Sequence, residues 1–321
     1  MTDIRPQASD APASVVIVTF NSADTIGACV ASVPAHVEVV VVDQASTDET
    51  VAAAAAARSD AVIVRAETNR GFGAGCNLGA ANSAGDVIVF LNPDAQLGVD
   101  GGQPLIDALR RPGVGLVGPR ILDQAGRDVT RCRVWGDPLR DVLNLVCPQR
   151  VLPVSLRQDV PASDPVYVAG GPVAYVQGAC MAIMRPVFDH VHGFDEAFFL
   201  YSEEEDLAGR LRAEGLAVWL EPRATITHIG HTSTDKTGQF AAEQYFRSRA
   251  VLYRRRYGAL EGFAGSLLLV GGLLLLLLTT PLRTVLGIRK AETVRFCLAG
   301  LRGIAAAMLR QPVRPPGQRS A

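Results

Sequence analysis

Four short apolar segments constrain the fold of this chain more than any other feature. They cover residues 14–20, 37–42, 61–65 and 86–91, are rich in valine and isoleucine, and end in polar or turn-forming residues. Short β-branched segments bounded in this way are typical of buried strands. Helix-forming segments at residues 23–33 and 51–57, and a third through Asn82, separate them. This alternation predicts an α/β fold with a mostly parallel, Rossmann-like sheet flanked by helices on both faces.

Polar side chains follow three of the predicted strands at the point where each strand ends. They are Asn21, Asp43 and Asp94. In open α/β sheets, ligands bind beyond the carboxyl ends of the strands, so these groups are expected at one binding edge. The carboxylate of Asp94 suits Mg²⁺ or Mn²⁺ that also holds substrate phosphates. The structural alternative for this segment is a simple Asn-Pro-Asp turn.

A glycine-rich segment, residues 69–79, follows the third predicted strand. Its glycines do not have Gly-x-Gly-x-x-Gly spacing and do not follow the first strand, which argues against a dinucleotide-binding fingerprint. A loop that allows the backbone to approach a phosphate or a sugar fits better. A plain glycine-rich turn into a helix is the alternative.

An acidic cluster lies in the second half of the chain, at residues 202–207. Acidic residues in the first turn of a helix are stabilised by the helix dipole, which is the ordinary explanation for such a cluster. Asp206 is placed to pair with Arg210 at the i,i+4 spacing, and Gly215 is expected to end the helix. The functional alternative is a general base that removes a proton from an attacking hydroxyl.

The segments around this cluster give further expectations. We expect strands at residues 115–120 and 217–220, and a kinked strand at 173–184. Residues 121–170 are expected to form an irregular acceptor-side insertion, or structural packing without substrate contact. His228 and His231 have i,i+3 spacing beside glycine and hydroxyl groups, which is typical of a site, and core histidines are the alternative. Lys236, Arg247 and Arg249 are expected either to contact a pyrophosphate or to be solvated.

The C-terminal region changes in character. Residues 263–282 are almost purely apolar and match the length of a bilayer core. Arginines at 254–256 precede them, and further basic residues follow at 283, 289 and 290. Residues 294–309 have the pattern of an interfacial amphipathic helix. We expect either one membrane span or a helix pair in the cytoplasmic leaflet, with a buried soluble helix as the alternative.

Composition limits the remaining possibilities. The net charge of −1 gives no indication of nucleic-acid binding. Six cysteines without a Cys-x-x-Cys pair suggest reduced, packed thiols in a cytosolic protein. The polar first dozen residues lack the apolar core of a signal peptide, so export is not expected. We therefore expect a flexible tail at 1–12, a catalytic domain at 13–257 and a membrane-associated helical region at 258–321.

The order of these motifs resembles that of the inverting family 2 glycosyltransferases of GT-A fold, in particular the bacterial rhamnosyltransferase-like group. The resemblance covers residues 14–257 and rests on Val41-Val42-Asp43-x-x-Ser46-x-Asp48-x-Thr50, Asn69-x-Gly71-Phe72, Phe90-Leu91-Asn92-Pro93-Asp94-Ala95 and the acidic cluster. It implies that Asp43 bonds the pyrimidine of the donor nucleotide. The other residues implied to bind this nucleotide are Thr19, Asn21, Ser46, Asn69, Gly71 and Asn92.

The resemblance also assigns the metal and the base. Asn92 occupies the first position of the Asp-x-Asp motif, which leaves Asp94 as its charged metal ligand, and His228 would complete the metal or diphosphate shell. Glu204 matches the general base of the Glu-Glu-x-Asp motif. Glu203 and Asp206 would then orient this base or the acceptor.

These observations predict a glycosyltransferase at the cytoplasmic face of the cell membrane. It would move a sugar from dTDP-rhamnose or a UDP-sugar to a lipid-linked or growing cell-envelope glycan, with inversion and with Mg²⁺ or Mn²⁺. Transfer onto polyprenyl phosphate itself is the competing reaction. A nucleotidyltransferase would need a basic phosphate-activating motif near residues 20–22, where the sequence has none. A non-catalytic sugar-nucleotide binder would not need the intact acidic cluster.

Overall fold

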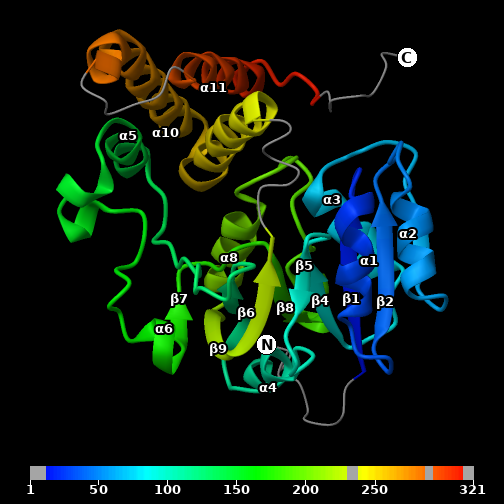
Figure 1. The fold of residues 1–321 in the computed structure, drawn as a ribbon. Coiled ribbons are helices and arrows are strands. Elements are labelled where there is room, and N and C mark those ends of the chain that lie inside the picture. Colours follow the sequence, from blue (N-terminus) through cyan, green and yellow to red (C-terminus); the bar gives the residue numbers. More distant parts are fainter. Residues whose placement is uncertain (1–11, 230–237, 286–291, 314–321) are drawn as a thin grey trace. The chain divides into compact units, whose positions relative to one another are not determined.

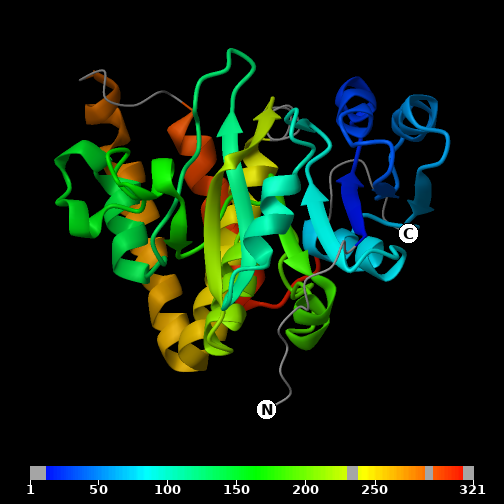
Figure 2. The same cartoon turned by 90° about the horizontal axis from the view of Figure 1, so that it is seen from below.

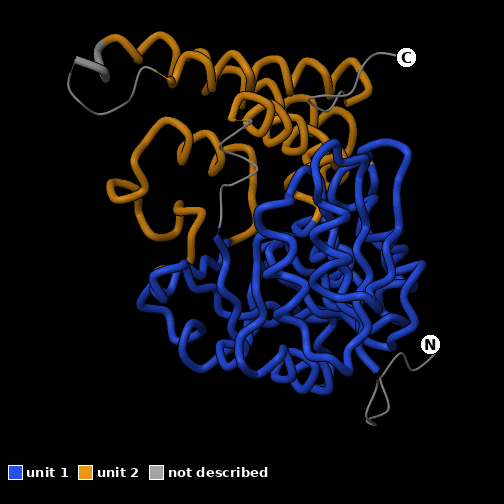
Figure 3. The backbone as a smooth tube through the Cα atoms, turned by 45° about the vertical axis from the view of Figure 1, so that its right-hand side comes forward, with its two compact units in different colours: residues 1–133, 162–196, 204–233 blue, residues 134–161, 197–203, 234–321 orange. Residues whose placement is uncertain are grey.

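The computed structural model describes residues 12–229, 238–285 and 292–313, with the side chains of 282–285 outside this description. His231 and Lys236 also lie outside the described residues. The chain divides into two compact units that are each built from separated stretches of sequence (Figure 3). The first contains residues 1–133, 162–196 and 204–233, and the second contains residues 134–161, 197–203 and 234–321.

The first unit begins with the predicted alternation of strands and helices (Figure 1). Its N-terminal elements are β1 (Ala13–Thr19), α1 (Ala23–Ala31), β2 (Glu38–Asp43), α2 (Thr50–Ala57), β3 (Val62–Arg65), α3 (Phe72–Ala81) and β4 (Val87–Leu91). Its later elements are β5 (Ala95–Leu97), α4 (Gln103–Leu109), β6 (Val114–Leu122), α6 (Val166–Ala169), β7 (Gly171–Val173), β8 (Cys180–Met184), α7 (Arg185–His190), α8 (Glu203–Ala213) and β9 (Ala217–His228). The helix α8 starts one residue before the unit boundary.

Within the described residues, nine strands form one sheet in the order β3-β2-β1-β4-β8-β6-β9-β5, with β7 also paired to β9. Figure 2 shows this sheet from below. The β3-β2-β1-β4 half is entirely parallel. The other half is mixed, because β8 runs antiparallel to both β4 and β6 while β6 and β9 are parallel. The expected α/β fold with a mostly parallel, helix-flanked sheet is confirmed, and the strands β8, β5 and β7 run antiparallel to their neighbours.

Glycine allows α3 to lie directly against the sheet. A Cβ atom on Gly79 would lie 2.2 Å from Val16 Cγ1, and one on Gly75 would lie 2.5 Å from Val18 Cγ1. Both valines belong to β1, so larger residues at these helix positions would push α3 away from the strand. The glycine-rich segment therefore serves close helix–sheet packing as well as the loop that precedes it.

Three sequence expectations about the second half of this unit are corrected. The single kinked strand at 173–184 is two strands, because β7 pairs with β9 while β8 pairs with β4 and β6. The short strand at 217–220 continues to residue 228 through an irregular register opposite Pro119 and Arg120. The strand β5, which follows Asp94 at once, is additional and pairs with β9.

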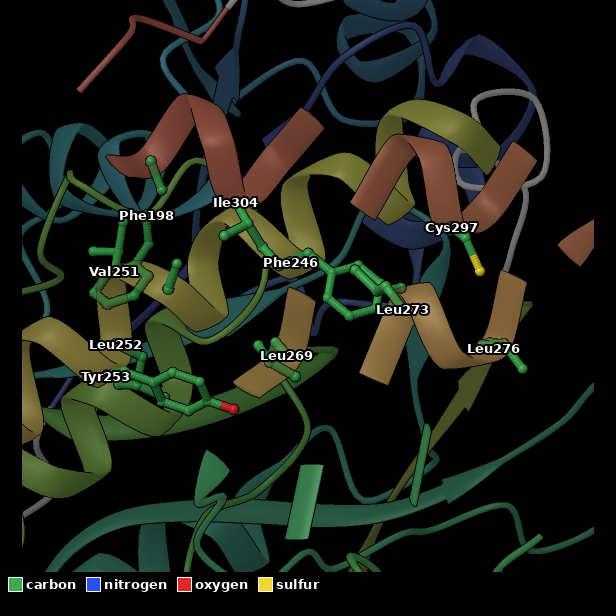
Figure 4. Close-up of a cluster of buried hydrophobic side chains, with 12 residues drawn as sticks. Phe198, Phe246, Val251, Leu252, Tyr253, Leu269, Leu273, Leu276, Cys297 and Ile304 are labelled. Carbon is green, nitrogen blue, oxygen red and sulfur yellow. The ribbon is translucent and has the colours of Figure 1, made fainter. Parts of the chain in front are cut away.

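The second unit is helical and has its own core. It contains α5 (Pro138–Val146), the 3₁₀ turns η1 (Gln149–Val151) and η2 (Val154–Leu156), α10 (Gly238–Val285) and α11 (Thr293–Met308). Residues 121–170 were expected to be irregular, but α5 forms within them: Asp137 accepts a bond from the backbone of Arg140, and proline follows this cap. The buried cluster of α10 and α11 includes Phe246, Leu269, Leu273, Cys297 and Ile304 (Figure 4).

A buried polar network joins α5 to α10 within this unit. Arg249 Nε donates to Asp141 Oδ2 at 2.8 Å, and both side chains are at least 95% buried. Gln158 and the Tyr253 hydroxyl also donate to Asp141. Burial raises the pKa of Tyr253, which keeps its proton for this bond. The expectation that Arg249 contacts a pyrophosphate or is solvated is therefore wrong, because its guanidinium is used inside the unit.

Replacing one member of this network should destabilise the second unit strongly. Arg249→Met leaves a buried carboxylate without its cation, which costs about 3–5 kcal/mol in the free energy of unfolding. The double variant Asp141→Leu/Arg249→Met should recover much of that loss, since both charges are removed. Urea unfolding followed by circular dichroism measures both variants, with Arg255→Met at an exposed position as the control. An unchanged unfolding midpoint in Arg249→Met would contradict the assignment.

Two further sequence expectations concern the cysteines and the apolar segment. All six cysteines are free, and burial raises the pKa of the Cys180 thiol to about 12, so it is an inert packed group. Among the described residues, one helix, Gly238–Pro281, is apolar and long enough to cross a membrane by length and composition. The helical backbone conformation of α10 is interrupted at Gly258, where φ is 84°.

Candidate active site at the carboxyl edge of the sheet

Asp43 lies at the carboxyl end of β2, next to Thr19 at the end of β1. Both side chains are almost fully buried. The Asp43 carboxylate accepts a hydrogen bond from the Ser46 backbone N–H at 3.3 Å, which fixes its orientation toward the loop. The Thr19 hydroxyl is buried without a hydrogen-bond partner among the described residues. An unsatisfied buried hydroxyl at this edge is a group that a ligand is able to satisfy.

The loops after β1 and β2 are held to each other by side chains predicted to bind the nucleotide. The backbone N–H of Asn21 donates to Ser46 Oγ at 2.8 Å. The Asn21 amide oxygen accepts from the Thr47 N–H, also at 2.8 Å. Asn21 has a φ of 52°, a left-handed conformation that asparagine tolerates better than most residues. Asn21 and Ser46 thus shape the edge around Asp43.

The glycine-rich loop is fastened to the same place by Gln44, a residue that the sequence reasoning missed. Gln44 is buried, its amide nitrogen donates to the Gly71 carbonyl, and its oxygen accepts from the Arg70 N–H at 3.0 Å. Asn69 Oδ1 accepts from the Gly71 N–H, also at 3.0 Å. Gly71 has a φ of 94°, which a residue with a side chain rarely adopts. The only signal in the sequence was an amide side chain directly after Asp43.

Asp94 and His228 meet at the other part of this edge. His228 Nε2 lies 3.1 Å from Asp94 Oδ1, and both side chains are largely buried. The contact arises because β5 follows Asp94 at once and pairs with β9, which ends at His228. The Ile229 N–H donates to the Asp94 carbonyl and closes this pairing. The two predicted metal ligands are therefore neighbours in space although 134 residues separate them.

Asn92 is tied into the structure by its backbone. Its N–H donates to the Ala179 carbonyl at 2.9 Å, and its carbonyl accepts from the Ala95 N–H and from Cys29 Sγ. Burial, and after it the negative charge of Asp94, raises the pKa of the Cys29 thiol far above its usual value. Cys29 thus stays protonated beneath the turn and donates to Asn92.

The chemistry of this pair suits a divalent cation. A carboxylate oxygen and an imidazole nitrogen are both ligands of Mn²⁺, and the hard carboxylate also suits Mg²⁺. No group of three or more His, Cys, Asp or Glu side chains with metal-binding placement occurs among the described residues. Two protein ligands are sufficient where substrate phosphates and water supply the other positions, as is usual for Mg²⁺ in phosphate-binding sites.

The acidic cluster starts α8, as predicted. Glu203 and Glu205 are buried, whereas Glu204 and Asp206 are partly exposed. Tyr201 and Ser202, directly before the helix, both have left-handed φ values, 69° and 66°. Two adjacent residues in this conformation carry a backbone cost, and such strain is commonly found at functional sites.

Arg210 anchors this helix in the first unit. Its Nε donates to Asp206 Oδ2 at 2.8 Å, which confirms the predicted i,i+4 pair. Its terminal nitrogen also donates to the carbonyls of Val191 and Gly193 in the turn after α7. The Arg210 guanidinium, which the carbonyls of Val191 and Gly193 hold in place, therefore fixes the position of the Asp206 carboxylate. The contacts to residues 191 and 193 were not predicted, since sequence spacing reveals only the partner within the helix.

The mixed sheet with polar side chains at its carboxyl edge has the arrangement of the GT-A fold. Residues 14–191, more than half of the chain, match the family model described as Glycosyl transferase family 2, and the chain belongs to this family.

Three proteins that are similar to this chain are each named as a sugar transferase. The chain is 30% identical over 264 residues to the N-acetylglucosaminyl-diphospho-decaprenol L-rhamnosyltransferase of Mycobacterium tuberculosis, covering 75% of this chain and 82% of the relative. It is 24% identical over 209 residues to the low-salt glycan biosynthesis hexosyltransferase Agl10 of Haloferax volcanii, covering 64% and 63%. The solved mannosyltransferase PcManGT from Pyrobaculum calidifontis, in complex with GDP-Man and Mn²⁺, shares the fold with a TM-score of 0.55, 16% identity and coverage of 97% and 91%.

Proposed function

We propose that this chain transfers a hexose, with L-rhamnose as the first candidate, from a nucleotide diphospho-sugar to a lipid-linked cell-envelope glycan. The contact between Asp94 and His228 carries the proposal, because the two side chains would form a metal-binding pair at the edge where Asp43 lies. The mycobacterial relative supports the sugar and the acceptor, since its name states a rhamnosyl transfer to a decaprenol-linked substrate. A UDP-sugar is the second candidate for the donor.

The residues of the edge would divide the work of donor binding. Asp43 would accept a hydrogen bond from the pyrimidine, and Thr19, Asn21, Ser46, Asn69, Gly71 and Asn92 would line the nucleotide site. Asp94 and His228 would hold Mg²⁺ or Mn²⁺. When bound, the cation supplies positive charge that stabilises the departing diphosphate.

Glu204 would act as the general base. The acceptor oxygen attacks the anomeric carbon from the side opposite the diphosphate, the bond from that carbon to the diphosphate oxygen breaks, and Glu204 takes the hydroxyl proton. Attack from the opposite side inverts the anomeric configuration. Glu203 and Asp206 would orient the base or the acceptor, and the fixed pair of Asp206 and Arg210 supports this role.

We place the catalytic domain at residues 13–257, after a tail at 1–12, and a membrane-associated region at 258–321. A membrane-bound acceptor and a soluble nucleotide sugar meet at the cytoplasmic face, which is the location proposed here. The apolar helix within α10 supports attachment to that membrane.

A donor and acceptor panel tests the proposal. Full-length protein is incubated with dTDP-rhamnose or with UDP-sugars, and with polyprenyl diphospho-sugar or polyprenyl phosphate as acceptor. Transfer of rhamnose to the polyprenyl diphospho-sugar, with an inverted anomeric configuration by NMR, is the expected result. Transfer to polyprenyl phosphate alone would replace the proposed acceptor, and retention of configuration would exclude Glu204 as the base of a single displacement.

Replacement of Asp43 should weaken nucleotide binding. Asp43→Ala leaves a polar group of the bound pyrimidine without a partner, which costs about 1–3 kcal/mol, or about fivefold to 150-fold in affinity. Asp43→Asn keeps one carbonyl acceptor and should lose less. Titration calorimetry with dTDP and with UDP measures both variants, and Asp24→Ala on the exposed face of α1 is the matched control. Equal affinity of Asp43→Ala and the control would refute the role of Asp43.

A further inference from the structure

The second half of α10 exposes an unusually apolar surface. From residue 262 to 281 this helix contains no charged residue. Several of its large side chains are 43–82% exposed, and they form what we call the outer face: Leu260, Phe263, Leu267, Leu268, Leu274, Leu275 and Leu278. They recur at intervals of three and four residues, so they lie along one side of the helix. A contiguous apolar surface of this kind marks a site of interaction.

Two of the three hydroxyl side chains between residues 262 and 281 lie inside, and the third, Thr279, is partly buried and donates to the Leu275 carbonyl. Ser266 and Thr280 are buried, and their hydroxyls donate to the carbonyls of Gly262 and Leu276 at 2.8 and 2.6 Å. A helix at a water-exposed surface has the opposite arrangement, with polar side chains outside and apolar ones inside. The outer face therefore suits a hydrocarbon environment.

The inner side of this helix is packed within the second unit. A Cβ atom on Gly272 would lie 3.1 Å from Val142 of α5, and one on Gly300 of α11 would lie 3.0 Å from Leu273. One on Gly262 would lie 2.5 Å from Arg254 Cα, because the chain turns back at Gly258. A helix that crossed the bilayer in this packing would take α5, α11 and residues 238–257 with it. These carry the Asp141–Arg249 ion pair and exposed charges, which are costly in hydrocarbon.

The exposed side of α11 combines basic and apolar residues. Arg295, Leu298 and Arg302 are exposed, and their spacing places them on one stripe of the helix, which the exposed Leu309 follows directly. The 16 residues of α11 span about 24 Å, less than the roughly 30 Å of a hydrocarbon core. Leucine with arginine on one surface is typical of helices that lie in the membrane interface, where arginine attracts anionic headgroups.

We infer that the second unit binds one leaflet of an anionic phospholipid membrane through the outer face of α10 and the arginines of α11, without spanning the bilayer. This deepens the proposed function, because an enzyme held in the interface meets a lipid-linked acceptor in the leaflet that it occupies. Both ends of the chain then lie on the same side of the membrane.

Membrane topology provides the first test. Full-length protein with one epitope at each terminus is expressed in bacteria, and inside-out membrane vesicles are treated with protease. Both epitopes should be digested at the same rate. Protection of the C-terminal epitope until detergent is added would show a span and overturn the inference.

Vesicle flotation provides the second test. Full-length protein should float with vesicles that contain phosphatidylglycerol. Leu274→Glu/Leu278→Glu should reduce the bound fraction about tenfold or more, because two apolar side chains are lost from the interface. Val99→Glu/Val168→Glu, at exposed apolar positions of the first unit, is the matched control and should float like the wild type. Arg295→Gln/Arg302→Gln should bind more weakly to these vesicles and equally to phosphatidylcholine vesicles.

Two measurements separate the possible outcomes. Light scattering without vesicles shows whether the outer face instead joins two copies of the chain. A dimer that becomes monomeric in Leu274→Glu/Leu278→Glu, without vesicle binding by the wild type, would overturn the inference. Donor affinity by calorimetry should be unchanged in every variant. Weak nucleotide binding by the wild type would therefore count against the proposed function alone, and failed flotation against the membrane surface alone.

Discussion

Glu204→Gln should abolish sugar transfer while leaving the affinity for the donor nucleotide unchanged. The amide has nearly the shape of the carboxylate but does not accept the hydroxyl proton, so a loss of about 10²–10⁴-fold in kcat is expected. Since only the transition state loses an interaction, kcat and kcat/KM should fall together. Initial rates with the donor and a polyprenyl diphospho-sugar acceptor measure this effect, and calorimetry measures donor affinity.

A matched control lies at the opposite end of the helix α8, which begins with the acidic cluster. Glu214, directly after α8, is about half exposed and contacts His190. Glu214→Gln changes the same functional group in the same unit and should leave turnover near that of the wild type. If Glu204→Gln also turns over like the wild type, another residue is the base.

Asp94→Asn should cause the second large loss, together with the response to metal. The substitution keeps an oxygen that is able to contact His228 but removes the negative charge that a divalent cation requires. A cation stabilises charge on the leaving group by several kcal/mol, so its loss should lower kcat by about 100-fold or more. Mg²⁺ and Mn²⁺ titrations of activity measure the response, with Asp107→Asn on α4 as the control.

Chelation is the decisive comparison for this prediction. The wild type should lose activity in EDTA and recover it with excess Mn²⁺ or Mg²⁺. Full activity of the wild type after exhaustive chelation would contradict a metal at Asp94 and His228. Protein cations alone would then have to stabilise the departing diphosphate.

The sequence predicted the first half of the fold well because its signals are local. Each of β1 to β4 is a short β-branched run, and α1, α2 and α3 fill the segments between them. The misplaced elements depend on distant partners. β5 has three residues and exists through its pairing with β9, and the segment 173–184 is divided because its two ends pair with different strands. No periodicity within a segment reveals such pairings.

In the candidate site too, residues with local sequence signals were predicted, whereas residues whose roles depend on distant partners were not. Asp43 and Asp94 were predicted because they come at or just after the ends of buried strands. His228 was predicted from its spacing with His231 and from the family resemblance. Gln44 was missed because its role depends on how the loop at Gly71 folds against it. Arg249 was misassigned because a basic residue near a predicted site looks the same in sequence whether it binds phosphate or a buried aspartate such as Asp141.

The pairing of β5 with β9 also determines when the edge of the sheet is complete during synthesis. The strands that carry Thr19 and Asp43 pair with each other and are finished within the first 43 residues. Asp94 must wait for His228, which leaves the ribosome 134 residues later, and closing so long a loop carries an entropic cost. We therefore expect a nascent chain to form the nucleotide half of the edge first and the metal-binding pair last. A chain that stops before β9 would lack one of the two proposed metal ligands.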